Sequence, residues 1–158
     1  MMTTKQLLVG VLALGWIPTL VLVGEPWDTT ERAWAQERTP IKVTRIYTGD
    51  DGQTHVEELD VPLGPPRGTS ELSEPVPLTS VQFRRTSPEY FLDWHNAPRR
   101  QYVVTLSGES EVEIGDGTKI HLYPGHILLA EDVDGQGHIS RARGSGDRIS
   151  LFLPLAEQ

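Results

Sequence analysis

The sequence predicts an all-β domain, a sandwich or a barrel of about ten short strands. The chain has 158 residues, the length of a single domain, and its 15 Gly and 12 Pro leave little room for long helices. Apolar and polar residues alternate in short stretches about every 8–12 residues, and turn sequences separate these stretches. No helical period appears after residue 36, so we expect strands joined by turns throughout the mature part.

The N-terminus predicts an export signal or a membrane anchor over residues 1–35. Residues 7–24 form an apolar run that follows the single cation Lys5. The sequence Ala33-Trp34-Ala35 has the small-residue pattern of a cleavage site, and cleavage after Gly24 or no cleavage are the alternatives. We therefore expect an exported protein, periplasmic or extracellular, or one that residues 7–24 hold at a membrane.

Residues 36–78 are expected to hold two strands and a long loop. The alternating stretches 41–47 and 54–61 flank a turn sequence rich in Gly and Asp, which predicts a hairpin. Residues 62–77 then contain five of the twelve prolines and show no periodicity. Because proline cannot donate to a strand ladder, this segment is predicted to be a surface loop.

Residues 79–158 are expected to form the core of the domain. Strands are predicted at 79–85 and 90–95, and from residue 101 the pattern is almost continuous strand and turn. In residues 109–114 three glutamates alternate with apolar or small residues, as in a strand with one solvent-facing side. The further strands are predicted at 118–123, 126–130, 138–143 and 148–153.

Composition excludes several classes of function. Lys and Arg number 14 against 22 Asp and Glu, and a net charge of −8 repels nucleic-acid phosphates, so no nucleic-acid partner is expected. The absence of Cys excludes disulfides and thiolate ligands, so a metal would need His, carboxylate or amide ligands. No phosphate-binding glycine loop, no G-x-S-x-G and no H-E-x-x-H sequence is present.

Two segments carry a resemblance to the cupin superfamily. In the segment 94–108, His95 takes the place of the first histidine of the first cupin motif, Gln101 that of its glutamate and Gly108 that of its glycine. The segment from Gly125 through Ala130 and Glu131 to His138 resembles the second motif. The resemblance covers roughly residues 79–153. This part of the chain is similar to small single-domain bacterial cupins, which implies a jelly-roll β-barrel.

The cupin resemblance also implies a divalent metal, held inside the barrel by three histidines and a glutamate. Ala97 stands here in place of the second histidine, Gln101 replaces the glutamate, and Glu131 occupies the place of a proline. Two imidazoles and a neutral amide give weaker binding than the full set. The expectation is either one ion (Fe, Mn, Zn or Ni) on His95, Gln101 and His138, or no metal.

The candidate site residues follow from the same segments. As catalytic groups we expect His95, His138 and Glu131. Glu131 is included because a partly buried acid beside Asp132 at the pocket mouth could have a raised pKa. Asp132 itself is expected to accept backbone hydrogen bonds in the turn that follows. Ligand binding is assigned to Arg99, Arg100, Gln101 and Tyr102. The two arginines either clamp a substrate carboxylate or pair with the chain's own acids.

Two functions from different classes remain open. The first is an exported small cupin enzyme that acts on a small organic molecule in its barrel pocket, as an oxygenase, isomerase or lyase. The second is a non-enzymatic cupin that binds a small ligand with the same residues, since a fold does not decide between them. The resemblance also implies a homodimer.

Overall fold

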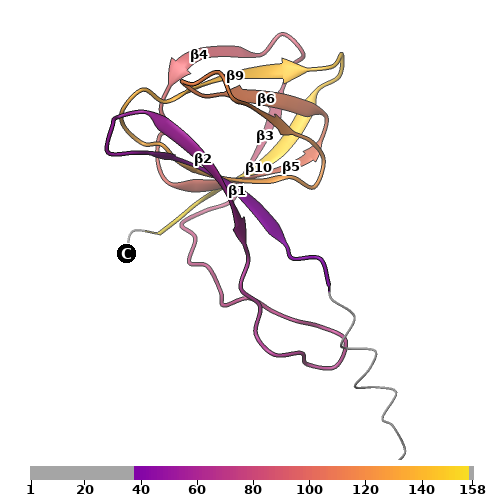
Figure 1. Cartoon of the computed structure of the whole chain (residues 1–158). Helices are drawn as coiled ribbons and strands as arrows, with labels where there is room; N and C mark the ends of the chain where they lie inside the picture. The colour runs from indigo at the N-terminus through magenta and orange to yellow at the C-terminus, as the bar shows by residue number, and fades with distance from the viewer. Residues whose placement is uncertain (1–37, 157–158) are drawn as a thin grey trace, which may run out of the picture. The chain divides into compact units, whose positions relative to one another are not determined.

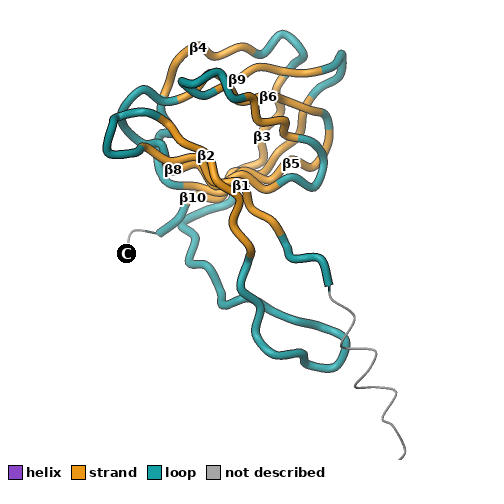
Figure 2. The backbone as a smooth tube through the Cα atoms, in the orientation of Figure 1, coloured by secondary structure: helices purple, strands orange, loops and turns teal. Residues whose placement is uncertain are grey.

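The computed structural model describes residues 38–156, which contain ten strands and no helix (Figure 2). The predicted signal or anchor, residues 1–35, lies outside the described residues. Within 38–156 there is consequently no helix that could span a membrane. Each of the expected strands is present with small changes at its ends, so the all-β prediction is confirmed.

Six strands form the larger sheet. Their order across the sheet is β2 (Thr54–Asp60), β1 (Lys42–Thr48), β8 (Ile127–Glu131), β5 (Gln101–Ser107), β10 (Arg148–Pro154) and β3 (Gln82–Thr86). All neighbours are antiparallel except β1 and β8, which run parallel. The hairpin β1–β2 therefore extends the same sheet that holds the C-terminal strands.

Four strands form the smaller sheet, in the order β4 (Phe91–His95), β9 (His138–Arg143), β6 (Glu109–Glu113) and β7 (Lys119–Leu122). All of its neighbours are antiparallel. Figure 1 shows this sheet across from the larger one, with the chain passing repeatedly between them.

The strands do not close into the β-barrel that the cupin resemblance implies, and they form a sandwich, the other architecture that the sequence predicts. The described strands form two separate sheets, because no ladder joins the edge strand β3 to β4 or the edge strand β2 to β7. Consecutive strands such as β3 and β4 thus belong to different sheets. The architecture is a two-layer sandwich with two open edges on each sheet.

The core lies between the layers. Strand alternation turns one side of each strand inward, so both sheets contribute apolar side chains. The buried cluster comprises Ile46, Ala97, Val103, Val112, Ile114, Ile120, Leu122, Leu128 and Ala130. Burial of each larger member stabilises the fold by about 1.5–3 kcal/mol. Because Ile46 comes from β1, the hairpin before the proline-rich segment takes part in this core.

The proline-rich segment is a loop, as predicted. Residues 62–77 contain no strand and are mostly exposed, and a single isolated bridge joins Arg67 and Ser70. Leu78 then makes a bridge to Leu155, which brings the chain back to the larger sheet before β3 begins.

Candidate functional site

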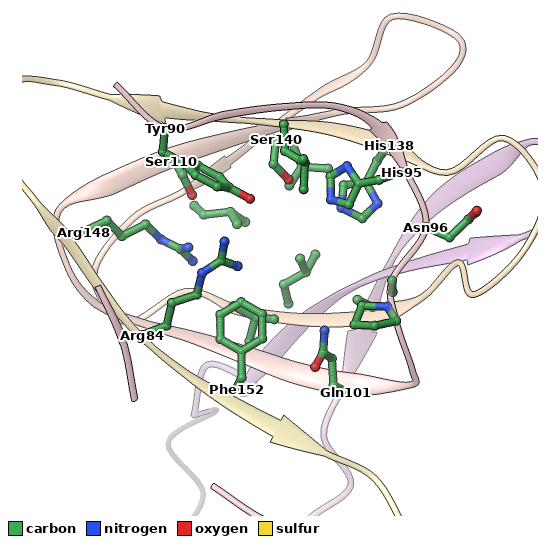
Figure 3. A pocket seen from close by; sticks show the side chains of 18 residues that line it. Arg84, Tyr90, His95, Asn96, Gln101, Ser110, His138, Ser140, Arg148 and Phe152 are labelled. Carbon is green, nitrogen blue, oxygen red and sulfur yellow. The ribbon is translucent and has the colours of Figure 1, made fainter. Parts of the chain in front are cut away.

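A cavity of about 350 Å³ lies between the two sheets (Figure 3). Its walls come from β3, β4, β5, β8 and β10 together with β6, β7 and β9. Apolar side chains such as Val112, Leu128 and Phe152 form much of the surface, and polar groups gather at two ends. A mostly apolar hollow with a few convergent polar groups is the usual form of a small-molecule site.

Two histidines occupy one end of this cavity. His95 closes β4 and His138 opens β9, and the two residues are register partners in the antiparallel pair. Their ring centroids are 4.3 Å apart and the rings are tilted by 57°. Gly137 permits this approach, because a Cβ there would lie 2.2 Å from the backbone oxygen of His95. The structure therefore brings together the two histidines that the motifs single out.

The hydrogen bonds of the two rings fix the same tautomer in both. His138 Nδ1 lies 2.5 Å from Asp132 Oδ2, and His95 Nδ1 lies 2.8 Å from the backbone oxygen of Asp93. A carboxylate or carbonyl oxygen can only accept, so each Nδ1 donates. In a neutral imidazole the remaining Nε2 then carries a lone pair, and neither Nε2 has a protein partner within residues 38–156.

Asp132 is the acid of this site. Its side chain is 0% exposed, and its second oxygen, Oδ1, has no hydrogen-bond partner among the described residues. A buried carboxylate on Nδ1 holds an imidazole in one orientation and stabilises the imidazolium that forms when Nε2 accepts a proton. The pair Asp132–His138 is consequently arranged as an oriented base.

His95 is held neutral. Burial lowers its pKa below the ordinary value of 6.5, and the neighbouring His138 and Arg84 lower it further, while the hydrogen bond to Asp93 and the charge of Asp132 oppose the change. Desolvation disfavours the charged form of any buried base. At neutral pH His95 is thus an uncharged ring beside His138.

The donor set does not fit a cupin-type metal centre. Gln101 and Ala97 are buried and line the cavity beside the histidines, but a neutral amide and a methyl group replace an anionic ligand and an imidazole. Within residues 38–156 no group of three or more His, Asp or Glu side chains is placed to hold a metal ion. Four-ligand sites of imidazole and carboxylate need more donors than this.

Two arginines occupy the other end of the cavity. Arg84 on β3 and Arg148 on β10 point into it, opposite the imidazoles (Figure 3). Arg148 is 5% exposed and donates from Nη2 to Thr105 Oγ1 over 2.9 Å. Burial and the charge of Arg84 lower the pKa of Arg148 to about 10. Neither arginine was assigned from the sequence.

Glu131, Arg100 and Tyr102 lie outside the cavity that holds the histidines, and Arg100 pairs with Glu131, which is one of the two alternatives expected for it. All three line a hollow on the opposite face of the larger sheet, beside the proline-rich loop. Glu131 accepts hydrogen bonds from Arg45 Nε at 2.5 Å and Arg100 Nε at 2.7 Å. Burial would raise the pKa of Glu131, yet these guanidinium groups lower it, which is opposite to the expected direction.

Arg99 also lies outside the cavity. It lines a shallow hollow that adjoins the cavity and shares Arg84, Pro98, Gln101 and Phe152 with it. Of the residues assigned from the sequence, the cavity therefore contains His95, Gln101 and His138.

The alternation of side chains along β8 could have identified Asp132 as a site residue from the sequence. Leu128 and Ala130 face the cavity, so the next residue on the same side is Asp132 and not Glu131. Arg84 and Arg148 gave no comparable signal. They meet only because β3 pairs with β10, and that pairing joins segments more than sixty positions apart in the sequence.

Comparisons with known proteins add little to this geometry. No protein-family model matches the chain, and no curated protein matches it. Among solved structures, an ethanolamine utilization protein Q from Salmonella typhimurium is 16% identical, with 76% of this chain and 100% of that chain covered and a TM-score of 0.39. Protein NMB1881 from Neisseria meningitidis is 15% identical, with 49% and 76% covered and a TM-score of 0.38.

Proposed function

We propose that this chain is a small cupin-type protein whose cavity between the sheets holds a small organic molecule and transfers a proton to or from it. The observation that carries the proposal is the buried hydrogen bond from His138 to Asp132, which leaves the Nε2 lone pair of His138 toward the cavity. The order of the strands and the positions of His95 and His138 in the cupin-like motifs support the class of protein.

The chemistry follows from the three side chains. His138 Nε2 takes a proton from a C–H bond next to a carbonyl, and the electron pair of that bond moves toward the carbonyl oxygen. Asp132 stabilises the resulting imidazolium. The imidazolium of His138 then gives the proton back to the ligand, either directly or after passing it to the Nε2 lone pair of His95 beside it. Reprotonation at another atom would make an isomerase, and loss of a neighbouring group would make a lyase.

Of the three reaction types considered from the sequence, isomerisation and elimination suit this site best. An oxygenase would need the metal that the donor set does not favour. The alternative of a non-enzymatic binding protein keeps the same cavity and the same histidines as hydrogen-bonding groups. It predicts ligand binding with no proton exchange, so one experiment separates the two.

The experiment measures C–H exchange in D₂O by proton NMR. The probes are 2-oxobutanoate, phenylpyruvate and 2-butanone, whose protons next to the carbonyl exchange slowly without a catalyst. We expect the protein to accelerate exchange in at least one probe, and His138→Gln to reduce the acceleration by about 10²–10⁴-fold, the usual contribution of a positioned base. His121→Gln is the control, because His121 lies on the surface, paired with Glu109.

An unchanged rate in His138→Gln would contradict the proposed base. Ligand binding without exchange in any probe would favour the non-enzymatic alternative.

Export and dimerisation belong to the same proposal. Residues 1–35 would direct export or anchor the protein, which a fusion to a reporter enzyme active only outside the cytoplasm tests. A homodimer is supported by exposed aromatic residues on the edge strands, among them Phe83 on β3 and Phe91 on β4. Light scattering of residues 36–158 measures its mass.

A further inference from the structure

The arginine end of the cavity is positively charged, whereas the protein as a whole is negatively charged. The chain carries 22 Asp and Glu and a net charge of −8, yet no Asp or Glu of the described chain lines this cavity. Apart from the two histidines at the opposite end, Arg84 and Arg148 are the only ionisable bases among the described residues of its walls. The arginine end of the cavity is thus positive inside an acidic protein.

Several other arginines of the domain form ion pairs with acids. Arg45, Arg100 and Arg141 each form ion pairs with glutamates. Among the described residues neither Arg84 nor Arg148 has such a pair. Arg148 is buried and Arg84 is half-buried. A buried cation in a protein is normally paired, because removing a charge from water without a partner is costly. The lack of an acidic partner for Arg84 and Arg148 is therefore the feature of this end of the cavity that needs an explanation.

The guanidinium groups also keep unused donors. Arg148 Nη2 donates to Thr105, but its Nε is buried without an acceptor in the described chain. Arg84 lies over the rings of Tyr90 and Phe152, 4.9 and 5.1 Å from their centroids, which holds the guanidinium without using its N–H groups. Each guanidinium carries five N–H donors, so several remain for a ligand.

The strand register places the two cations side by side. Arg84 pairs with Ser150 across β3 and β10, and Arg148 lies two residues before Ser150 on the same face. Figure 3 shows both side chains reaching into the same space, with Tyr90 and Ser110 next to them. Their mutual repulsion would be relieved by one anion between them.

We propose that Arg84 and Arg148 form the anion subsite of this cavity and bind the carboxylate of a small organic acid. The inference rests on the proposed function in taking the cavity as the place where the small molecule is held. Guanidinium meets carboxylate through parallel hydrogen bonds, and two arginines can engage both oxygens. The apolar walls, including Val112 and Phe152, then contact the body of the acid, which extends toward His95 and His138.

The size of the cavity limits the ligand. Its volume of about 350 Å³ is at the lower end of the range for ligand sites, about 300–1,000 Å³. A monocarboxylate with a short chain or a single ring matches this space. The anion at one end then fixes which carbon of the ligand lies at the histidine end.

Calorimetry and amide NMR titration of residues 36–158 test the subsite. Benzoate is the probe, benzamide is the neutral control of the same shape, and inorganic phosphate is the control for anions in general. We expect benzoate to bind with a millimolar or lower Kd and to shift amide signals of β3 and β10, and we expect benzamide and phosphate to bind at least tenfold more weakly. Benzamide or phosphate binding as tightly as benzoate, or no binding of benzoate, would overturn the proposal.

Variants locate the binding. Arg84→Gln and Arg148→Met should each weaken benzoate binding at least tenfold, while Arg85→Gln, the next residue on β3 and exposed, should leave it unchanged. Arg148→Met should also raise the melting temperature without ligand, since it removes a buried charge that lacks a counter-ion. If Arg148→Met does not fold, Arg84→Gln decides alone, and wild-type affinity in that variant rejects the subsite.

The outcomes separate this inference from the proposed function. Benzoate binding requires no chemistry, so it is measured equally well in His138→Gln. Binding without C–H exchange would keep the subsite and remove the acid–base role. Exchange of the neutral 2-butanone together with failure to bind benzoate would keep the acid–base role and remove the subsite.

Discussion

Asp132 Oδ2 and His138 Nδ1 lie 2.5 Å apart, and both side chains are buried. The two residues are held by different parts of the chain. Asp132 follows β8 in the larger sheet and its backbone oxygen accepts from Ala97, whereas His138 begins β9 in the smaller sheet. Their hydrogen bond therefore joins the two layers at the end of the cavity where we place the chemistry.

Removing the carboxylate should destabilise the fold as well as the site. Asp132→Ala leaves the Nδ1–H of His138 buried without an acceptor, which costs about 1–3 kcal/mol in the free energy of unfolding. Urea denaturation measures the difference. Asp134→Ala is the matched control, because the hydrogen bonds at Asp134 use its backbone oxygen. Equal stability of Asp132→Ala and the wild type would show that the bond has no structural role.

Gly137 should be intolerant of a side chain. It has φ of 73°, and a Cβ would lie 2.2 Å from the His95 oxygen, so Gly137→Ala must move β4 away from β9. We expect a loss of more than about 2 kcal/mol, because a clash with backbone adds to the cost of about 1 kcal/mol for a left-handed alanine. Gly117→Ala controls for the backbone cost alone, since φ there is 84° and nothing lies within 4 Å. Similar losses in both variants would refute the tight β4–β9 approach.

Stability should fall as the pH falls below about 6.5. Burial lowers the pKa of His95 and of His126 in the folded state, so the unfolded chain takes up protons first. The free energy of unfolding then decreases with decreasing pH from 6.5, the ordinary histidine pKa, down to the folded pKa of each group, and changes no further from these groups below it. Asp132, His138 and Arg84 face His95, and Glu58, His121 and Arg148 act on His126.

Urea denaturation between about pH 7.5 and 5 measures this dependence. His95→Gln and His126→Gln should each reduce the slope over that interval. A slope that is the same in both variants as in the wild type would show that neither ring is held neutral by burial.

If the cavity has too few donors to hold a metal ion, adding a donor should raise its affinity for metal. Ala97→His would place a third imidazole beside His95 and His138, and we expect the affinity for zinc or manganese to rise by at least about tenfold in calorimetry. Gln101→Glu adds an anion to the same wall and should act in the same direction. Tight binding by the wild type, with no gain in either variant, would mean that the existing donors already form a metal centre.

The sequence predicted the strands because alternation and turn residues are local features, and it predicted the histidine pair through the resemblance to the two cupin motifs. Alternation fixes which residues of a strand share a face, and the turns around Gly115 and Gly135 separate the strands. The sequence did not decide between a sandwich and a barrel, because closure depends on whether the edge strands β3 and β4 pair with each other. Adjacent candidates such as Glu131 and Asp132 were confused because one residue of register exchanges the two faces.

The anion subsite could not be predicted for a related reason. Arg84 stands between Phe83 and Arg85, and Arg148 stands between Asp147 and Ile149, so nothing in either segment marks these arginines as site residues. Only the antiparallel pairing of β3 with β10 brings them to one face. Their lack of an acidic partner is then a property of the assembled cavity.

The central claim is that His95 and His138 present unprotonated Nε2 atoms to the cavity. Long-range proton–nitrogen NMR of the imidazole rings at about pH 8 tests it directly, because the two nitrogens of each ring report which one carries the proton. The account predicts the Nδ1–H tautomer in both rings, with the His138 tautomer lost in Asp132→Ala. The Nε2–H tautomer in His138 would contradict the account, since that ring could then neither donate to Asp132 nor accept a proton from a ligand.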